Sequence, residues 1–234
     1  MKNTVISSVI ITIGVIISSF VLSNSIENYR NFSRFVEVKG LDEKIVKSNL
    51  ASWQINFTLS NDDLKKIYSD LSFSQNTIIK FLLDQGFSEN EIEKQAISVQ
   101  DNHNSYDNKK GPRFFANSGI NLSTNKVDLV NSVAQKTGAL VESGIVINYS
   151  NIRYMFTELN SIKTEMLNKA TTNAKDAAET FAKNSNSSIG KIKKASQGTI
   201  SITAVNSNPN DMYSDEASIM KKVRVVTSIE FFIK

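Results

Sequence analysis

The sequence predicts an α+β fold in which helices pack on one face of a largely antiparallel sheet. Three observations support this prediction. Residues 51–59 alternate strictly between apolar and polar side chains, as a half-buried strand does. Three later stretches repeat apolar residues at helical spacing. Strand-like runs lie between these stretches, so the elements follow in the order ββαββαβαββ, after an apolar N-terminal segment.

Residues 4–26 carry no charge and are dense in Val, Ile, Leu and Phe. Roughly 20 such residues suffice for a helix to span the ~30 Å hydrocarbon core of a bilayer. We therefore expect residues 1–26 to hold a transmembrane anchor centred on Val5 to Leu22, with the rest of the chain outside the cytosol. A cleaved signal peptide is the alternative, although the apolar run is long for one and Ser23–Ser25 is a poor cleavage site. Residues 27–34 then form a polar link.

The first strand is expected at Phe35–Lys39, ended by Gly40. The second strand, residues 51–59, places Trp53 in phase with the apolar positions, so we expect this side chain in the core and not in a ligand site. A helix follows, with Ser60 or Asn61 as its cap and apolar residues from Leu64 to Leu82, and it ends at Gly86.

Two strand-like runs come next, Gln95–Asp101 and Arg113–Thr124, and they flank a polar segment. This pattern predicts a β-hairpin whose exposed tip is residues 102–111. A second helix is expected over Lys126–Val141.

Gly144 is expected to close this second helix. In the strand predicted after it, Ile145–Thr157, the apolar positions change phase, which indicates a bulge near Ser150 and Asn151.

The longest predicted helix is Glu158–Lys183. Its apolar face is expected to hold Leu159, Ile162, Met166, Ala170, Ala174, Ala177 and Phe181. Because alanines allow a close approach, Ala170, Ala174 and Ala177 are candidate contacts with a second copy of the chain. Packing of this face on the chain's own sheet is the alternative.

The last two strands are expected at Ile189–Val205 and Ser218–Ile233, separated by a turn-rich segment, residues 206–211. If the final strand is an edge, it offers Val223 and Val225 for pairing with a neighbouring chain. The basic residues around them would then limit uncontrolled pairing.

The composition excludes several function classes. The chain has no cysteine, which removes disulfides, thiol catalysis and cysteine metal sites. Its net charge is +4, but acidic and basic residues are interspersed, so we do not expect nucleic-acid binding. The one histidine, His103, lies in the expected hairpin tip, where a single imidazole makes a poor metal site.

No nucleophile elbow of the Gly-x-Ser-x-Gly type occurs, and the adjacent carboxylates Asp42–Glu43 and Asp62–Asp63 are expected to serve as caps or as solvated surface groups. The sequence thus predicts no catalytic, cofactor-binding or metal-binding residue and no enzyme activity. A hydrolase is the alternative that turnover abolished by Ser or Asp substitutions would support.

Several motifs resemble the SIMPL-domain family. Residues 165–179 and the following Ile189-Gly190-Lys191-Ile192 are similar to the family's alanine-rich helix and the strand after it. Residues 36–40, 51–55 and 81–87 also match, so the resemblance covers about 35–234. It implies a bacterial envelope protein that is periplasmic or membrane-anchored, self-associates and has loose links to envelope or oxidative stress. The family often has Asp where this chain has Asn49.

We therefore expect residues 35–234 to form a SIMPL-like domain in the periplasm, held at the inner membrane by the N-terminal helix unless that helix is cleaved. The expected function is that of a non-enzymatic homo-oligomer without a cofactor. The alternative is a binding module that recruits a partner protein or a cell-wall component through the 102–111 tip.

Overall fold

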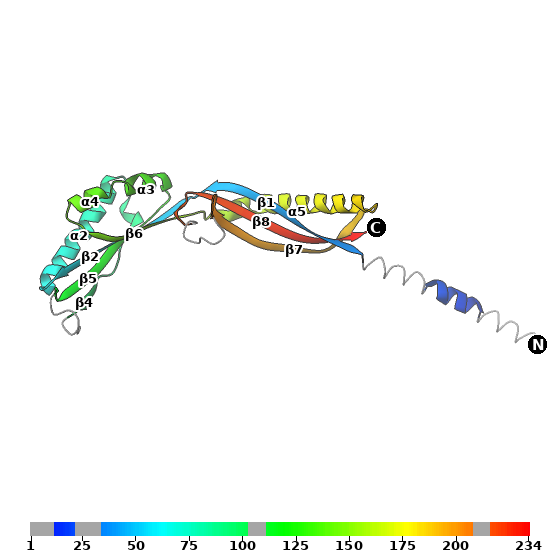
Figure 1. Cartoon of the computed structure of the whole chain (residues 1–234), viewed down its shortest axis with the longest axis horizontal. Coiled ribbons are helices and arrows are strands. Elements are labelled where there is room, and N and C mark those ends of the chain that lie inside the picture. The colour runs from blue at the N-terminus through cyan, green and yellow to red at the C-terminus, as the bar shows by residue number, and fades with distance from the viewer. Residues whose placement is uncertain (1–11, 22–33, 103–110, 208–215) are drawn as a thin grey trace, which may run out of the picture. The chain divides into compact units, whose positions relative to one another are not determined.

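The computed structural model of the chain describes residues 12–21, 34–102, 111–207 and 216–234. Residues 12–21 are helical. After them come β1 (Phe35–Lys47), β2 (Leu50–Asn61), α2 (Leu64–Asp84), η1 (Glu89–Glu91), β3 (Ile92–Lys94), β4 (Ser98–Asp101), β5 (Phe114–Thr124), α3 (Val127–Ala134), α4 (Gly138–Glu142), β6 (Ile147–Met155), α5 (Leu159–Asn184), β7 (Ile189–Ala204) and β8 (Met220–Ile233) (Figure 1). The predicted α+β class with mostly antiparallel pairing is confirmed.

The strands form two sheets and not the single sheet that we expected. The chain also divides into two compact units. The α2 unit comprises residues 45–159 and 202–223 and holds the five-stranded sheet. The α5 unit comprises the described residues up to Lys44 together with 160–201 and 224–234, and it holds α5 and most of β1, β7 and β8.

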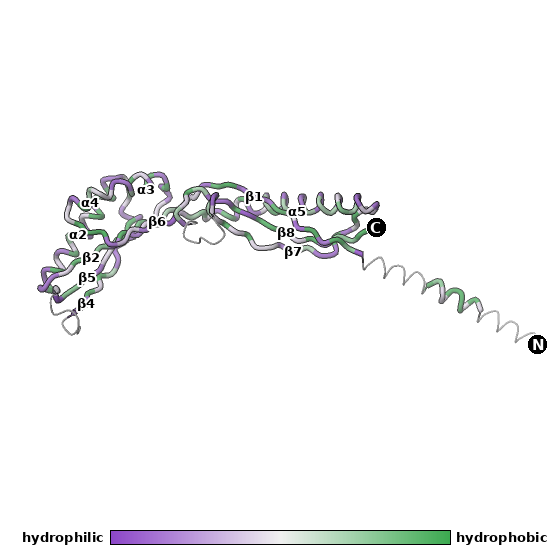
Figure 2. Tube along the Cα trace, viewed as in Figure 1, coloured by the Kyte–Doolittle hydropathy of each residue, from purple (hydrophilic) through white to green (hydrophobic). Residues whose placement is uncertain are grey.

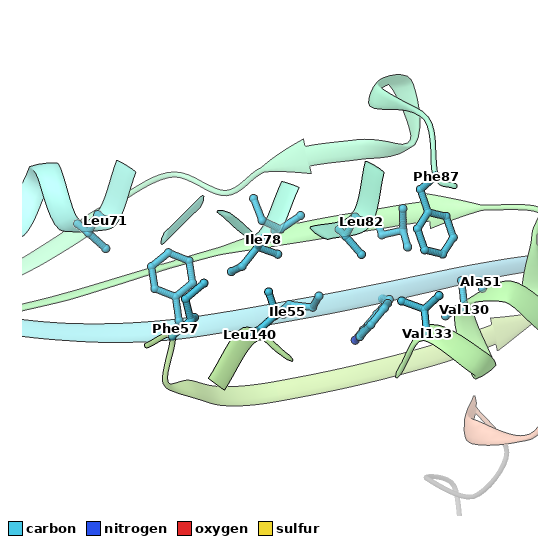
Figure 3. Close-up of a cluster of buried hydrophobic side chains, with 14 of the residues drawn as sticks. Ala51, Ile55, Phe57, Leu71, Ile78, Leu82, Phe87, Val130, Val133 and Leu140 are labelled. Carbon is cyan, nitrogen blue, oxygen red and sulfur yellow. The ribbon is translucent and has the colours of Figure 1, made fainter. Parts of the chain in front are cut away.

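In the α2 unit, β2 lies between β5 and β6, and β3 and β4 both pair with β5. The register of β2 on β5 runs without interruption from Ala51↔Thr124 to Asn61↔Phe114. The apolar alternation of β2 directs Ala51, Ile55 and Phe57 to the face that the helices cover, as Figure 3 shows.

Trp53 belongs to this core, as predicted, because its side chain is only 1% exposed. Its indole nitrogen still has a partner, since Nε1 donates a hydrogen bond to Ser150 Oγ at 3.0 Å. Figure 2 shows hydrophobic and hydrophilic residues mixed along the strands that build this core.

The cap of α2 differs from the prediction. Strand β2 continues to Asn61, and Asp63 is the cap, because its Oδ1 accepts from the backbone N–H of Lys65 at 2.8 Å and of Lys66 at 3.3 Å. Asn61 instead accepts from the N–H of Asp63, so it supports the cap from one step earlier.

Three helices end in the same way. Gly86, Gly144 and Asn186 have φ angles of 98°, 83° and 53°, the left-handed region that suits the residue after a helix. After α2, the N–H of Gly86 donates to Leu83 O and that of Phe87 to Leu82 O, which satisfies two carbonyls of the last turn. The predicted helix ends at Gly86 and Gly144 are confirmed.

The helix predicted over Lys126–Val141 is two short helices, α3 and α4, separated by a turn. Leu140 is buried, whereas Val141, the last residue of the predicted helix, is 59% exposed. The turn between α3 and α4 changes the orientation of α4, so that Leu140 and not Val141 faces the core.

A bulge in β6 lies at Asn148 and not near Ser150 and Asn151 as predicted. Phe57 pairs with Ile147 and the preceding residue, Asn56, pairs with Tyr149, so Asn148 is the extra residue. Beyond the bulge, Ser150 pairs with Ile55 and accepts the hydrogen bond from Trp53, although Ser150 is itself exposed. Because this position is polar, the alternation of apolar residues did not show where the phase changes.

The α5 unit has a three-stranded sheet in the order β1-β8-β7, and α5 packs on one face of it (Figure 1). The sheet is antiparallel between β1 and β8, since Arg34 O accepts from Ile233 N near one end and Ile219 O accepts from Ser48 N near the other. Gly40 does not end the first strand as predicted, because β1 continues to Lys47.

Within the residues that the structure describes, no helix is both long enough and apolar enough to cross a membrane. Most of the predicted anchor, residues 1–11 and 22–26, lies outside the described residues.

Candidate functional site

The alanine face of α5 packs against the chain's own sheet. Its buried residues recur every four positions, at Met166, Ala170, Ala174, Ala178 and Ala182. The predicted face continued through Ala177, which is half-buried, and Phe181, which is 61% exposed. A row with a spacing of four is inclined to the helix axis, so it follows a twisted strand better than the mixed spacing that we assumed.

Gly40 is what allows this close approach. A Cβ at this position would lie 1.8 Å from the Ala170 carbonyl oxygen and 2.8 Å from the Ala174 Cβ. The helix backbone therefore rests almost on the strand backbone, and any side chain at residue 40 would push the two apart. The sequence signal for this contact was the glycine itself, which we interpreted as the end of a strand.

The residues that we selected as oligomer contacts are thus mostly interior. Ala170, Ala174, Val223 and Val225 are 0% exposed, and Ala177 packs against the same core. The contacts at Val223 and Val225 required strand β8 to be an edge, but β8 lies between β1 and β7 and is paired on both sides. A second copy of the chain would have to bind to other residues.

Strand β7 is the edge that the final hairpin exposes. It runs for 16 residues, and residues 191–197 are exposed at every position, so neither face is covered along this stretch. Ile192 is 52% exposed. Among the described strands, only β8 pairs with β7, so the outer edge of β7 presents backbone donors and acceptors to solvent.

Lys193 of β7 is engaged with its own sheet. Its Nζ lies 3.0 Å from Glu230 Oε2 and 3.2 Å from the centre of the Phe35 ring, which links β7 to β8 and β1 on the face that α5 leaves open. The cations that would oppose uncontrolled pairing at this edge are therefore Lys191 and Lys194.

An ion pair joins the two strands at the base of the predicted hairpin tip. Arg113 forms a bidentate pair with Asp101, with Nη2 at 2.8 Å from Oδ2, and its guanidinium lies 4.8 Å from the centre of the Phe114 ring. Hydrogen bonding to Asp101 raises the pKa of Arg113. Residues 103–110, with His103, lie outside the described residues, so the tip itself is not placed.

Asn49 has a structural role. Its Oδ1 accepts from the Thr157 N–H at 2.8 Å, and its Nδ2 donates to Thr157 Oγ1 at 2.9 Å and Glu158 Oε1 at 3.1 Å. The amide thus ties the β1–β2 turn to the chain just before α5. An aspartate at this position would keep only the accepting half of this arrangement.

The carboxylates with shifted pKa values belong to surface networks. Hydrogen bonds from Lys169 and Lys44 lower the pKa of Glu165 to about 2. Burial acts to raise the pKa of Glu91, but hydrogen bonds from Thr124, Ser88 and Lys126 outweigh it and the pKa lies below its usual value. A carboxylate held ionised in this way is a poor general acid or base near neutral pH.

Among the described residues, no three His, Cys, Asp or Glu side chains gather as they would around a metal ion. Asp62, which we expected to cap or be solvated, accepts from the Arg113 N–H at 2.8 Å. Glu43 pairs with Arg224 at 3.7 Å.

The described part of the chain is thus an α+β protein with two sheets. Gly40 and the alanine row of α5 form a close contact between helix and strand, which we call the small-residue seam, and β7 forms a long exposed edge. Residues 36–231 match a known family, SIMPL, described as a protein of unknown function (DUF541). The match covers most of the chain, so this protein belongs to the SIMPL family, as the resemblance indicated. No curated protein matches the sequence.

Proposed function

We propose that this chain is a non-enzymatic protein of the bacterial envelope that self-assembles through the outer edge of β7. Three features support the proposal. The family is SIMPL, residues 4–26 are uncharged and apolar, and the described part of the chain gathers no metal-ligand cluster. The observation that carries self-assembly is the 16-residue edge strand with its continuously exposed stretch, 191–197.

Edge-to-edge pairing suits this strand. An isolated edge is a template for a further strand, and two copies of β7 related by a two-fold axis would join their three-stranded sheets into one of six strands. The proposal places the N-terminal segment in the inner membrane and the folded chain in the periplasm. The family's loose link to envelope or oxidative stress would then describe the setting of the assembly.

Self-assembly is tested by the molar mass of the full-length chain in detergent, measured by light scattering at micromolar concentration. We expect more than one copy per particle. Ile192→Lys adds a charge to β7 and should reduce the mass to that of one chain. The matched control is Ile45→Lys on β1, the other edge strand of the same sheet, where the side chain is similarly exposed (58% against 52%). A strict monomer, or equal effects of the two substitutions, would contradict the proposal.

The location is tested by fractionating cells that express the unmodified chain. The proposal expects the protein in the inner-membrane fraction, resistant to a high-salt wash and digested by protease only when the outer membrane has been opened. Full-length protein in the soluble cytosolic fraction would contradict it.

A further inference from the structure

The open face of the five-stranded sheet carries a depression lined by uncharged polar groups. In β2 the residues that alternate with the core, such as Gln54 and Asn56, point away from the helices. The depression has a volume of about 240 Å³. Its lining consists of Asn56, Phe57, Gln95, Ala96, Ser98, Asn117, Ser118 and Asn148. None of these residues is charged.

One amide oxygen in this lining has no partner. Asn56 Oδ1 is buried and accepts no hydrogen bond from any residue that the structure describes. Buried polar atoms are nearly always satisfied, because an unpaired one costs about 1–3 kcal/mol. A ligand in the depression would remove the cost if the amide turned toward it and accepted one of its hydrogen-bond donors.

A glycine allows this oxygen to lie close to strand β5. Gly119 pairs with Asn56 across the β2–β5 ladder. A Cβ on Gly119 would lie 2.5 Å from Asn56 Oδ1 and 3.0 Å from Gln95 Oε1. Both amide oxygens therefore lie close to the Gly119 backbone, in positions that any other residue at 119 would disturb.

Gln95 is held in place from three directions. Its backbone N–H donates to Gly119 O at 2.9 Å, and its side-chain Nε2 donates to Asn121 Oδ1 at 2.7 Å. Its carbonyl oxygen accepts from Nε2 of Gln75, a buried residue of α2, at 3.2 Å. The acceptor Oε1 is thus positioned before any ligand binds, which lowers the entropy cost of binding.

The bulge in β6 contributes one residue to the lining of the depression. The extra residue, Asn148, lines the depression, and the next residue, Tyr149, pairs with Asn56. Tyr149 is not part of the lining itself, but as the cross-strand partner of Asn56 it leaves the sheet on the same face, and it is 48% exposed. Without the bulge the alternation of β6 would turn this ring toward the core.

We propose that this depression binds one neutral sugar ring of a glycan. Amide groups both donate and accept hydrogen bonds, which matches hydroxyl and acetamido groups, and the absence of charge in the lining disfavours ionic ligands. The exposed ring of Tyr149, on the same face of the sheet, can stack on the apolar C–H face of a pyranose. The volume is below the ~300–1,000 Å³ of pockets for drug-sized ligands, which indicates a single ring. This inference does not depend on self-assembly.

The test uses the full-length chain in a detergent without a sugar headgroup. The probes are N-acetylglucosamine, its β-1,4-linked trimer and a neutral tripeptide, each titrated by calorimetry and by saturation-transfer NMR. We expect the monosaccharide to bind, and the trimer to bind at least as well if the natural source is a glycan chain and no better than the monosaccharide if it is a free sugar. In both cases the tripeptide should not bind.

Two substitutions separate binding from folding. Asn56→Ala should weaken sugar binding by about tenfold or more while leaving the melting temperature unchanged or higher, because it removes an unsatisfied buried oxygen. Tyr149→Ala should also weaken binding, and Tyr149→Phe should restore it, since the ring is kept. Ser52→Ala, on the same face of β2 but outside the lining, is the matched control and should change neither quantity.

Three results would overturn the proposal. The first is no binding of either sugar at tens of millimolar. The second is binding of the tripeptide in place of the sugars. The third is binding that Asn56→Ala leaves unchanged or that Ser52→Ala weakens equally.

Discussion

The two units cover their sheets with helices in opposite ways. In the α2 unit, large side chains such as Trp53, Phe57 and Leu71 fill the space between helix and sheet. In the α5 unit, Gly40 and a row of alanines bring the helix backbone down onto the strand. The first unit is therefore vulnerable to the loss of atoms and the second to their addition.

The largest expected effect is truncation in the α2 unit. Trp53→Ala should lower the free energy of unfolding by about 3–5 kcal/mol, since it removes a fully buried ring and leaves a cavity. Denaturant unfolding followed by circular dichroism measures the change. Phe73→Ala is the matched control, because that side chain is 65% exposed and its truncation should change stability by no more than about 0.5 kcal/mol. Equal losses would contradict the assignment of the core.

The next effect is the addition of a methyl group in the α5 unit. Gly40→Ala should destabilise by about 1–3 kcal/mol or more, because its Cβ meets a backbone oxygen that cannot move without the helix. Gly138→Ala is the control, since a Cβ there has nothing within 4 Å and should be neutral or slightly stabilising. A neutral Gly40→Ala variant would contradict the close contact between Gly40 and α5.

A smaller effect concerns the residue with a positive φ angle that follows α2 in one unit and α5 in the other. Gly86→Ala forces a Cβ into a left-handed conformation and should cost about 1–2 kcal/mol. Asn186→Gly, after α5, should be neutral or slightly stabilising, because glycine adopts the same φ more easily. Thermal unfolding of both variants gives the comparison. A stabilised Gly86→Ala variant would show that the observed φ is wrong.

The smallest effect concerns pH. The pKa of Glu165 is lowered from 4.5 to about 2 by Lys169 and Lys44, so its contribution to stability is complete above pH 4.5 and is lost as the pH falls toward 2. Glu165→Gln should remove that part of the acid dependence, and added salt should weaken it in the wild type. Unfolding curves between pH 2 and pH 6 measure both. The same acid dependence in the variant would exclude this ion-pair cluster.

The sequence predicted what depends on local patterns. The alternation of β2 and the helical spacing of α2 and α5 were sufficient to place these elements, and Gly86 and Gly144 correctly marked the ends of α2 and α4. Local patterns failed where a contact distant in sequence decides the role of a residue. Gly40 was interpreted as a strand end because the sequence does not show its contact with α5. Strand β8 was considered as an edge because the sequence does not show its pairing with β1.

The same limit applies to the two surfaces that carry the proposals. The β7 edge follows from strand order, which periodicity does not reveal. The amide depression requires the register of β2 against β5 and the bulge at Asn148, and its residues are spread from 56 to 148. Asn and Ser are so frequent in this chain that no short motif distinguishes them.

The most direct test of the central claim uses the absence of cysteine in the sequence. Single cysteines placed in turn at residues 191–197 of the full-length chain would report on β7 pairing in intact cells without added oxidant. We predict a covalent dimer at the position nearest the two-fold axis and none for Thr180→Cys, an exposed control on α5. Monomers at every position, in cells whose other envelope proteins form disulfides, would contradict export, self-assembly through β7, or both.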